Sequence, residues 1–187
     1  MKKGKLFILS GPSGVGKSTV RMELFKKEDL NLKYSISMTT REPRNGEQDG
    51  IDYFFVSQDR FKEAIRDGEL LEYAEFVNNF YGTPKSYVNH LLDKGYNVVL
   101  EIEVEGAKQV MVKCPEAISV FIIPPSFEAL ENRIRGRRSE SEDTIQLRLQ
   151  KARYELLLTK NYKHVITNES IEKTAEKIAD IIRSDDE

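Results

Sequence analysis

Short runs of apolar residues alternate with longer stretches of helical periodicity along this 187-residue chain. The apolar runs lie at residues 5–10, 97–102 and 117–123, and a weaker run lies at 164–167. Near-continuous apolar strands that are separated by helices are typical of a parallel sheet covered on both faces. We therefore predict an α/β fold in which helices flank a parallel-sheet core.

Two segments have the spacing of amphipathic helices. Isoleucine and alanine recur at helical intervals between residues 171 and 182, and either Asn168 or Ser170 can serve as the N-cap. Apolar residues recur in the same way between residues 145 and 156. The simplest interpretation of both stripes is packing against the core.

Residues 33–87 have a different pattern. Residues 35–40 and 53–56 are rich in β-forming side chains, a loop with proline and glycine separates them, and an aromatic-rich stretch follows. We predict a small antiparallel, β-rich lobe here. It would be inserted into a core made of residues 1–32 and 88–187.

Composition excludes some classes of protein but does not indicate a function. The chain has 29 basic and 31 acidic residues, so its overall charge does not favour nucleic acid or an anionic membrane as a partner. Cys114 is the single cysteine and cannot form an internal disulfide. The apolar run that follows the basic N-terminus is shorter than the ~7–15 residues of a signal peptide, and no segment approaches the ~20 residues of a membrane span. We expect a cytoplasmic protein. The lack of a coiled-coil pattern only weakly favours a monomer, and the oligomeric state stays open.

The clearest motif is a phosphate-binding loop. Residues 11–18 match G-x-x-x-x-G-K-[ST] directly after a predicted strand and before a helical stretch. Glycines let backbone N–H groups surround phosphate oxygens, the lysine reaches the β- and γ-phosphates, and the serine hydroxyl is a ligand for Mg²⁺. We assign ATP binding to the residues of this loop and its immediate extension: Gly11, Pro12, Ser13, Gly14, Val15, Gly16, Lys17, Ser18 and Thr19.

Absent motifs favour some classes of P-loop protein over others. The chain has no Asn-Lys-x-Asp sequence of the kind that reads guanine in GTPases. Its two histidines, His90 and His164, are not followed by the Arg-Asp of a protein-kinase catalytic loop. A phosphate acceptor is already anionic and needs positioning and charge neutralisation more than a base. The pattern therefore favours transfer to a phosphate group.

Arginines supply candidates for that neutralisation. Arg133, Arg135, Arg137 and Arg138 precede a turn rich in serine and glutamate, and Arg148 follows it. Guanidinium groups bind phosphate through two parallel hydrogen bonds and keep their charge. We interpret Arg135 and Arg138 as partners of nearby glutamates. For Arg133, Arg137 and Arg148, a phosphate contact and a solvated helix face both stay open, and residues at about 136–147 fit a mobile lid.

Taken together, these features resemble the guanylate kinases over nearly the whole chain, from about residue 5 to residue 182. The most specific likeness is Ser37-Met38-Thr39-Thr40-Arg41-Glu42-Pro43-Arg44-Asn45-Gly46-Glu47, followed by Gly50-Ile51-Asp52-Tyr53. The resemblance implies a core, a GMP-binding lobe and a helical lid. It assigns the GMP phosphate to Arg41, Arg44, Tyr53 and Tyr81, and the guanine base to Ser37, Glu72 and Thr83. It assigns the ATP phosphates to Arg133, Arg137 and Arg148, and the adenine to Asn168.

The sequence departs from the family pattern at three positions. Glu103 and Glu105 stand where the family usually has Asp and Gln, and Arg138 stands where glycine is usual. The resemblance implies that the acid at position 103 helps to hold magnesium-bound water or the guanine. We keep Glu103 as a substrate-binding residue and interpret these changes as adjustments of the site.

The reaction implied by the resemblance is ATP + GMP → ADP + GDP with Mg²⁺, for which Ser18 would be a ligand. Nothing identifies a group that reads the 2′-hydroxyl, so dGMP is an expected acceptor as well. Two alternatives stay open. One is a catalytically dead, peptide-binding module of the same fold, although such modules typically lose the phosphate loop that is intact here. The other is a kinase for AMP or UMP.

Overall fold

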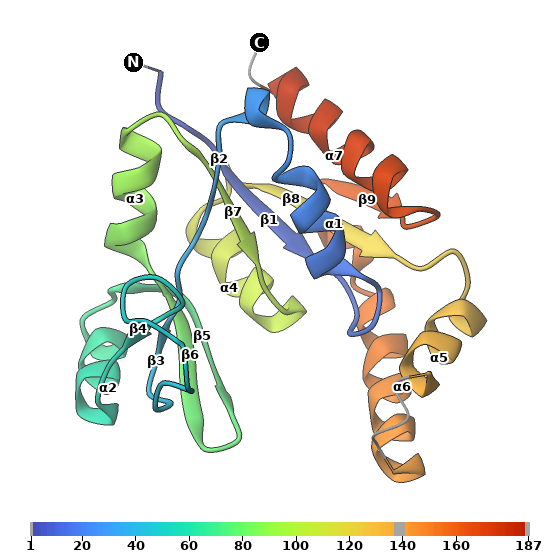
Figure 1. Ribbon diagram of the computed structural model, residues 1–187, viewed down its shortest axis with the longest axis horizontal. Helices are drawn as coiled ribbons and strands as arrows, with labels where there is room; N and C mark the ends of the chain where they lie inside the picture. The colour runs from blue at the N-terminus through green and yellow to red at the C-terminus, as the bar shows by residue number, and fades with distance from the viewer. Residues whose placement is uncertain (1, 137–140, 186–187) are drawn as a thin grey trace. The chain divides into compact units, whose positions relative to one another are not determined.

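The computed structural model describes residues 2–136 and 141–185 (Figure 1). Its strands are β1 (Leu6–Ser10), β2 (Leu32–Tyr34), β3 (Met38–Thr39), β4 (Phe54–Phe55), β5 (Leu70–Phe76), β6 (Asn79–Pro84), β7 (Asn97–Glu101), β8 (Ile118–Ile123) and β9 (His164–Thr167). Its α-helices are α1 (Lys17–Leu24), α2 (Gln58–Arg66), α3 (Lys85–Asp93), α4 (Val104–Lys113), α5 (Phe127–Arg135), α6 (Glu142–Leu156) and α7 (Ile171–Asp185). Short 3₁₀ turns lie at Glu28–Leu30 and Thr159–Asn161.

Within the described residues, the larger sheet has five strands in the order β2-β7-β1-β8-β9. Strand β8 pairs in parallel with β1 on one side and with β9 on the other. Side chains of β1 and β8 are almost wholly buried, as near-continuous apolar runs predict. The α/β prediction is confirmed, and the four strands predicted from apolar runs are β1, β7, β8 and β9.

One compact unit comprises Phe7–Leu32, Glu101–Val104 and Ile118–Glu187. In it, α1 and α7 lie side by side (Figure 1). Serines begin two of its helices: the Ser126 hydroxyl accepts a hydrogen bond from Ala129 N–H ahead of α5, and the Ser141 hydroxyl accepts one from Thr144 N–H ahead of α6. These caps fix the residue at which each helix starts.

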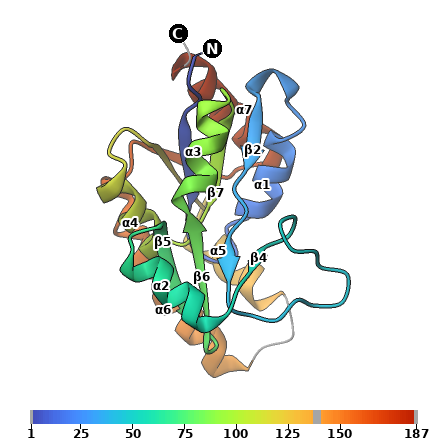
Figure 2. The same ribbon diagram turned by 90° about the vertical axis from the view of Figure 1, so that its left-hand side faces the viewer.

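The other compact unit comprises Met1–Leu6, Lys33–Leu100 and Glu105–Ala117. It contains a four-stranded sheet in the order β4-β3-β6-β5, with α2 packed against it (Figure 2). The core between them contains Met38, Phe61, Ala64 and Leu70. The predicted boundaries of the inserted lobe, residues 33–87, stay a prediction.

Three details differ from the expectation or add to it. The small sheet is not wholly antiparallel, because β3 and β4 run parallel while β3/β6 and β5/β6 run antiparallel. The same segment also contains a helix, α2, which the sequence pattern did not single out. Ser170, not Asn168, caps α7: its hydroxyl accepts a hydrogen bond from Lys173 N–H.

Over the ranges 2–136 and 141–185, none of the helices combines the length and the apolar character that a bilayer crossing requires.

Candidate functional site

The loop between β1 and α1 has the backbone that its glycines permit. Gly11 and Gly16 have φ values of +148° and +100°, a region that residues with a Cβ rarely adopt. A Cβ on Gly11 would lie 2.4 Å from the Ile122 carbonyl oxygen, so this position also needs glycine for space. Gly16 is the N-cap of α1 and offers no side-chain cap, which leaves the first N–H groups of the helix available to an anion.

Lys17 is the first residue of α1, and its side chain folds back over the loop. Its Nζ donates to the carbonyl oxygens of Gly11 at 2.6 Å and Pro12 at 3.3 Å. Burial lowers the pKa of Lys17, while the nearby carboxylates, Glu103 first, oppose that shift. A partly desolvated ammonium group of this kind is suited to bind a phosphate.

The Ser18 hydroxyl oxygen and a Glu101 carboxylate oxygen lie next to each other. The Ser18 hydroxyl donates to Glu101 Oε1 at 2.5 Å, and Arg21 Nε donates to Glu101 Oε2 at 2.6 Å. The sequence analysis did not identify Glu101, which it read as part of a strand. Glu101 is the last residue of β7, and the carboxyl ends of parallel strands are where α/β proteins place ligands. That position was the signal that could have found it.

Two of the predicted lid arginines reach the phosphate loop. Arg133, on α5, donates to the Val15 carbonyl oxygen at 3.1 Å, and Arg148, on α6, donates to the Ser13 hydroxyl at 2.7 Å. Asn168 also donates to the Val15 carbonyl oxygen, at 2.8 Å, while its own Oδ1 accepts from the Thr174 hydroxyl at 2.9 Å. Asn168 is thus a support of the loop, and its predicted contact with adenine stays a prediction.

The remaining arginines of this segment separate into two groups. Arg135 binds both oxygens of Glu142, at 2.7 and 3.0 Å, and also contacts Glu131 at 2.8 Å. Its predicted role as a local ion-pair partner is confirmed. Arg137 and Arg138 lie outside the described residues.

Glu103 is exposed and pairs with a lysine of α6. Lys151 Nζ donates to Glu103 Oε2 at 2.5 Å and lies 3.7 Å from the Glu155 carboxylate. Burial raises the pKa of Glu155, although the positive charge of Lys151 opposes this. Lys151 and Glu155, which the sequence analysis did not select, therefore belong to the charge network around Lys17.

The small sheet has one face for packing and one for the predicted GMP residues. Met38 pairs with Phe54 on one side and Gly82 on the other, and this layer faces the α2 core. The next layer, Thr39 with Phe55 and Tyr81, points to the opposite face because side chains alternate along a strand. By the same alternation along β6, Tyr81 and Thr83 lie on this opposite face, where the Tyr53 ring meets the Tyr81 ring. Ser37 directly precedes β3, and its carbonyl oxygen accepts a hydrogen bond from Phe54 N–H at 2.8 Å.

Arg41 lies among aromatic rings at this face. Its guanidinium carbon is 5.4 Å from the centre of the Tyr53 ring, and the Tyr53 and Tyr81 rings meet edge to face at 6.1 Å. Arg41 also binds both oxygens of Glu47, at 2.9 and 3.0 Å, and Glu47 accepts from Arg44 N–H at 2.7 Å. The hydrogen bonds with Glu47 raise the pKa of Arg41 further. Three of the predicted phosphate-binding residues are therefore brought together, and Glu47 orients the arginine of that set.

Glu72 and Thr83 meet within the same unit. The Thr83 hydroxyl donates to Glu72 Oε1 at 2.6 Å, and Glu72 is only 7% exposed. Burial raises the pKa of Glu72, while the Thr83 hydrogen bond and the charge of Lys113 oppose that shift. A buried carboxyl group held by one hydroxyl can still accept hydrogen bonds from a second donor group.

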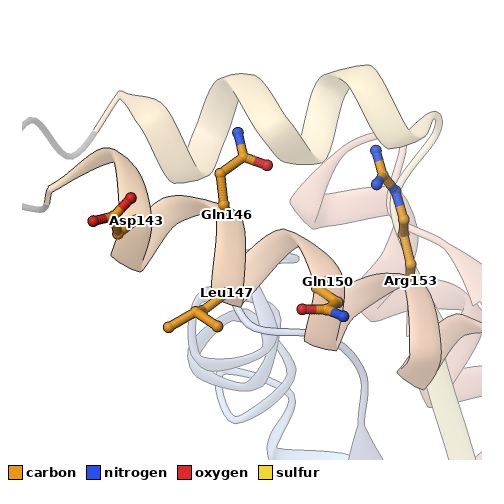
Figure 3. A pocket seen from close by; sticks show the side chains of 5 residues that line it. All are labelled: Asp143, Gln146, Leu147, Gln150 and Arg153. Atoms are coloured by element: carbon orange, nitrogen blue, oxygen red, sulfur yellow. The ribbon is translucent and has the colours of Figure 1, made fainter.

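A cavity of about 530 Å³ on α6 does not coincide with any predicted site residue (Figure 3). Its lining side chains all come from that one helix: Asp143, Gln146, Leu147, Gln150 and Arg153. The Arg153 guanidinium also lies over the Phe127 ring, 4.6 Å from its centre. The candidate residues therefore form two groups, one around the phosphate loop and one on the face of the small sheet, and each group belongs to its own compact unit.

The chain is similar to known proteins over nearly its whole length. The profile of the guanylate kinase family matches residues 3–185. A guanylate kinase from Mycoplasma mycoides is 55% identical over 182 residues, which cover 97% of this chain and 61% of that protein. One from Streptococcus thermophilus is 50% identical over 184 residues, 98% of this chain and 88% of that protein. The crystal structure of guanylate kinase from Anaplasma phagocytophilum superposes with a TM-score of 0.74 at 36% identity, and covers 98% of this chain and 87% of that one.

The chain thus spans about three fifths of the length of the Mycoplasma relative, 61%, and most of the length of the streptococcal one, 88%. The profile match covers both the phosphate loop and the small sheet, which carry the two groups of candidate residues. With a family profile that spans nearly all of its residues, this chain belongs to the guanylate kinase family.

Proposed function

We propose that this chain transfers the γ-phosphoryl group of ATP to GMP and, since no group selects the 2′-hydroxyl, also to dGMP. The observation that carries the proposal is the Glu72 carboxyl group, buried and held by Thr83 in the same unit as the Arg41 cluster. That unit offers an acceptor site for a purine base and for its phosphate. The phosphate loop offers the donor site.

Guanine recognition follows from the hydrogen-bonding groups of the base. Guanine presents two parallel donors, N1–H and the 2-amino group, and an ionised Glu72 can accept from both. Adenine has no proton on N1, so in the same position it would leave a buried carboxylate without partners. The carboxyl group therefore attracts guanine and rejects adenine.

Phosphate recognition requires no general base. Arg41, aligned by Glu47, supplies a planar pair of donors for the GMP phosphate, with the Tyr53 and Tyr81 rings beside it. Lys17 and the arginines that reach the loop neutralise the phosphates of ATP. An anionic acceptor oxygen can attack once it is aligned and its charge is offset.

The Ser18 hydroxyl and the Glu101 carboxylate fit a magnesium ion, because Mg²⁺ prefers oxygen ligands and takes the rest of its shell from water and phosphates. When bound with ATP, the ion offsets the negative charge of the phosphates. Ser18 would be its ligand from the chain, and Glu101 would orient that hydroxyl.

The test is a coupled ADP-release assay with ATP and a panel of nucleoside monophosphates. We expect activity with GMP and dGMP and little with AMP or UMP. Glu72→Ala should lower kcat/KM for GMP by about two to four orders of magnitude, the value of two charge-assisted hydrogen bonds. Glu75→Ala, an exposed glutamate of the same strand, is the matched control and should behave as the wild type.

Preference of the wild type for AMP or UMP would refute guanine selection. An absence of ADP release with every monophosphate would favour the peptide-binding alternative over an enzyme.

A further inference from the structure

Strand β5, which carries Glu72, is both an edge strand and irregular. It lies at the end of the small sheet and pairs only with β6 in it. Leu70 pairs with Pro84 and Tyr73 with Gly82, so three steps along β5 face two steps along β6. This extra residue is a β-bulge, which re-aims a side chain and disrupts the ladder locally. The bulge includes Glu72.

Helix α4 binds the backbone of β5 on both sides of Glu72. The Gln109 side-chain amide forms two hydrogen bonds with Tyr73: its Nε2 donates to the Tyr73 carbonyl oxygen at 2.9 Å, and its Oε1 accepts from Tyr73 N–H at 3.2 Å. One turn further, Lys113 Nζ donates to the Leu70 carbonyl oxygen at 2.9 Å. The Gln109 amide thus forms hydrogen bonds of the kind that a neighbouring strand would form if β5 were not at the edge of the sheet.

The same face of α4 also touches the carboxyl group. A Cβ on Gly106 would lie 2.8 Å from Glu72 Oε2. Gly106, Gln109 and Lys113 are spaced three and four residues apart, which places them along one side of a helix. This side of α4 therefore anchors the β5 backbone at Leu70 and Tyr73, on either side of Glu72 in the chain, and its Gly106 lies against the Glu72 carboxyl group.

The contact between Gln109 and Tyr73 is better suited to fixing the position of β5 than to raising the folding stability of the protein. Tyr73 is 38% exposed at the sheet edge, so water could satisfy its N–H and carbonyl groups if Gln109 were absent. A hydrogen bond that water can replace contributes little to folding free energy. The position of a recognising group is more sensitive, because a displacement of about 1 Å is enough to weaken directed hydrogen bonds.

We propose that Gln109 is a positioning residue for guanine recognition: by pairing with Tyr73 it fixes the bulge of β5, and through the bulge it fixes the Glu72 carboxyl group. The proposal rests on the proposed function, in which Glu72 accepts hydrogen bonds from the base. It adds a residue on α4 that would act on the base through Tyr73 and Glu72.

The test compares Gln109→Met, which keeps the length of the side chain and removes both hydrogen bonds, with Lys108→Met on the exposed side of the same helix. Kinetics are measured with GMP and with IMP, which lacks the 2-amino group. We expect Gln109→Met to raise KM for GMP about tenfold and to reduce the preference for GMP over IMP. Values of kcat, KM for ATP and Tm should stay close to those of Lys108→Met. Gln109→Asn, which keeps the amide but shortens its reach, should show the same loss.

A double-mutant cycle shows whether Gln109 acts through Glu72. In a Glu72→Gln background, adding Gln109→Met should change KM for GMP less than twofold. An unchanged preference for GMP over IMP in Gln109→Met, or an undiminished effect in the Glu72→Gln background, would overturn the proposal while leaving the proposed function intact. A wild type that does not prefer GMP over AMP would instead refute the proposed function, and the role of Gln109 with it.

Discussion

The Glu72 carboxyl group illustrates, at the scale of one residue, a conflict between stability and binding. It is buried, and its pKa is raised because burial disfavours the charged form. The guanine recognition proposed for Glu72 nevertheless needs the ionised form. Groups that are selected for binding are often unfavourable for folding, and Glu72 fits that description.

Replacing Glu72 by glutamine should therefore stabilise the free protein at neutral pH. Because the folded-state pKa is raised, the folded protein binds the proton more tightly than the unfolded chain. The wild type thus loses stability as the pH rises from the ordinary glutamate value through the raised pKa, and the loss persists above it. Thermal denaturation should show a higher Tm for Glu72→Gln at pH 8, and a difference that shrinks toward pH 4. Glu75→Gln in the exposed part of the strand is the control. A pH-independent difference would show that ionisation of Glu72 has no effect on stability.

The environment of Lys17 leads to a prediction for catalysis. Its ammonium group is held by the Gly11 and Pro12 carbonyl oxygens and is partly desolvated. Lys17→Met keeps most of the side-chain volume and removes the charge. We expect kcat to fall by about two to three orders of magnitude, as for loss of one transition-state donor, while calorimetric affinity for GMP stays nearly unchanged. A folded variant that retains more than about a tenth of wild-type turnover would show that Lys17 does not have this role.

At the scale of elements, the sequence predicts best where a pattern is long and its environment uniform. The buried strands β1 and β8 and the helix α7 have many consecutive residues in one environment, so periodicity identifies them. Strands β3 and β4 have two residues each and lie within the segments 35–40 and 53–56 that are rich in β-forming side chains, but so few residues do not indicate which strands pair. Their parallel pairing depends on how the intervening loop crosses, which no local signal records.

Site residues also differ in whether a local sequence pattern identifies them. The P-loop and the signature around Arg41 are local sequences, so they can be recognised directly. The contacts of Glu101 and Gln109 are created only by the fold, across 83 positions for Ser18 and Glu101 and 36 for Gln109 and Tyr73. For the cap of α7, the sequence left Asn168 and Ser170 as alternatives. The Asn168 amide forms its hydrogen bonds with Val15 and Thr174 instead, and Ser170 caps the helix.

The contact between α4 and β5 leads to a prediction for Gly106. A Cβ at this position would lie 2.8 Å from Glu72 Oε2 and 3.4 Å from its Cδ, so the flexible carboxyl group would have to move. Gly106→Ala should still fold, since alanine is favoured over glycine in a helix by about 1 kcal/mol. We expect KM for GMP to rise at least about tenfold, as for loss of one charge-assisted hydrogen bond, with KM for ATP and Tm retained. Lys108→Ala is the control, and wild-type GMP kinetics in Gly106→Ala would show that the carboxyl group tolerates the displacement.

At the scale of the whole molecule, the likeness to the family identifies the fold more specifically than any single motif does. A P-loop alone is compatible with NTPases, switches and kinases. The second signature, from Ser37 to Tyr53, is what distinguishes this family. The profile match over residues 3–185 shows the family for nearly the whole chain. Arg137, which the resemblance assigns to the ATP phosphates, lies outside the described residues, and its role stays a prediction.

The residues proposed to bind the phosphoryl donor and the acceptor belong to different compact units, with Lys17 in one and Glu72 in the other. Phosphoryl transfer requires reacting atoms about 3–3.5 Å apart and a site from which water is excluded. We therefore expect the chain to become more compact when GMP and a non-hydrolysable ATP analogue bind together. Small-angle scattering should show a radius of gyration that decreases toward the value of about 16 Å typical of a compact domain of 187 residues. Each ligand alone should give a smaller change, and UMP with the analogue is the control. An unchanged radius with both ligands bound at saturation, verified by calorimetry, would show that the reacting groups are aligned without a change in the arrangement of the two units.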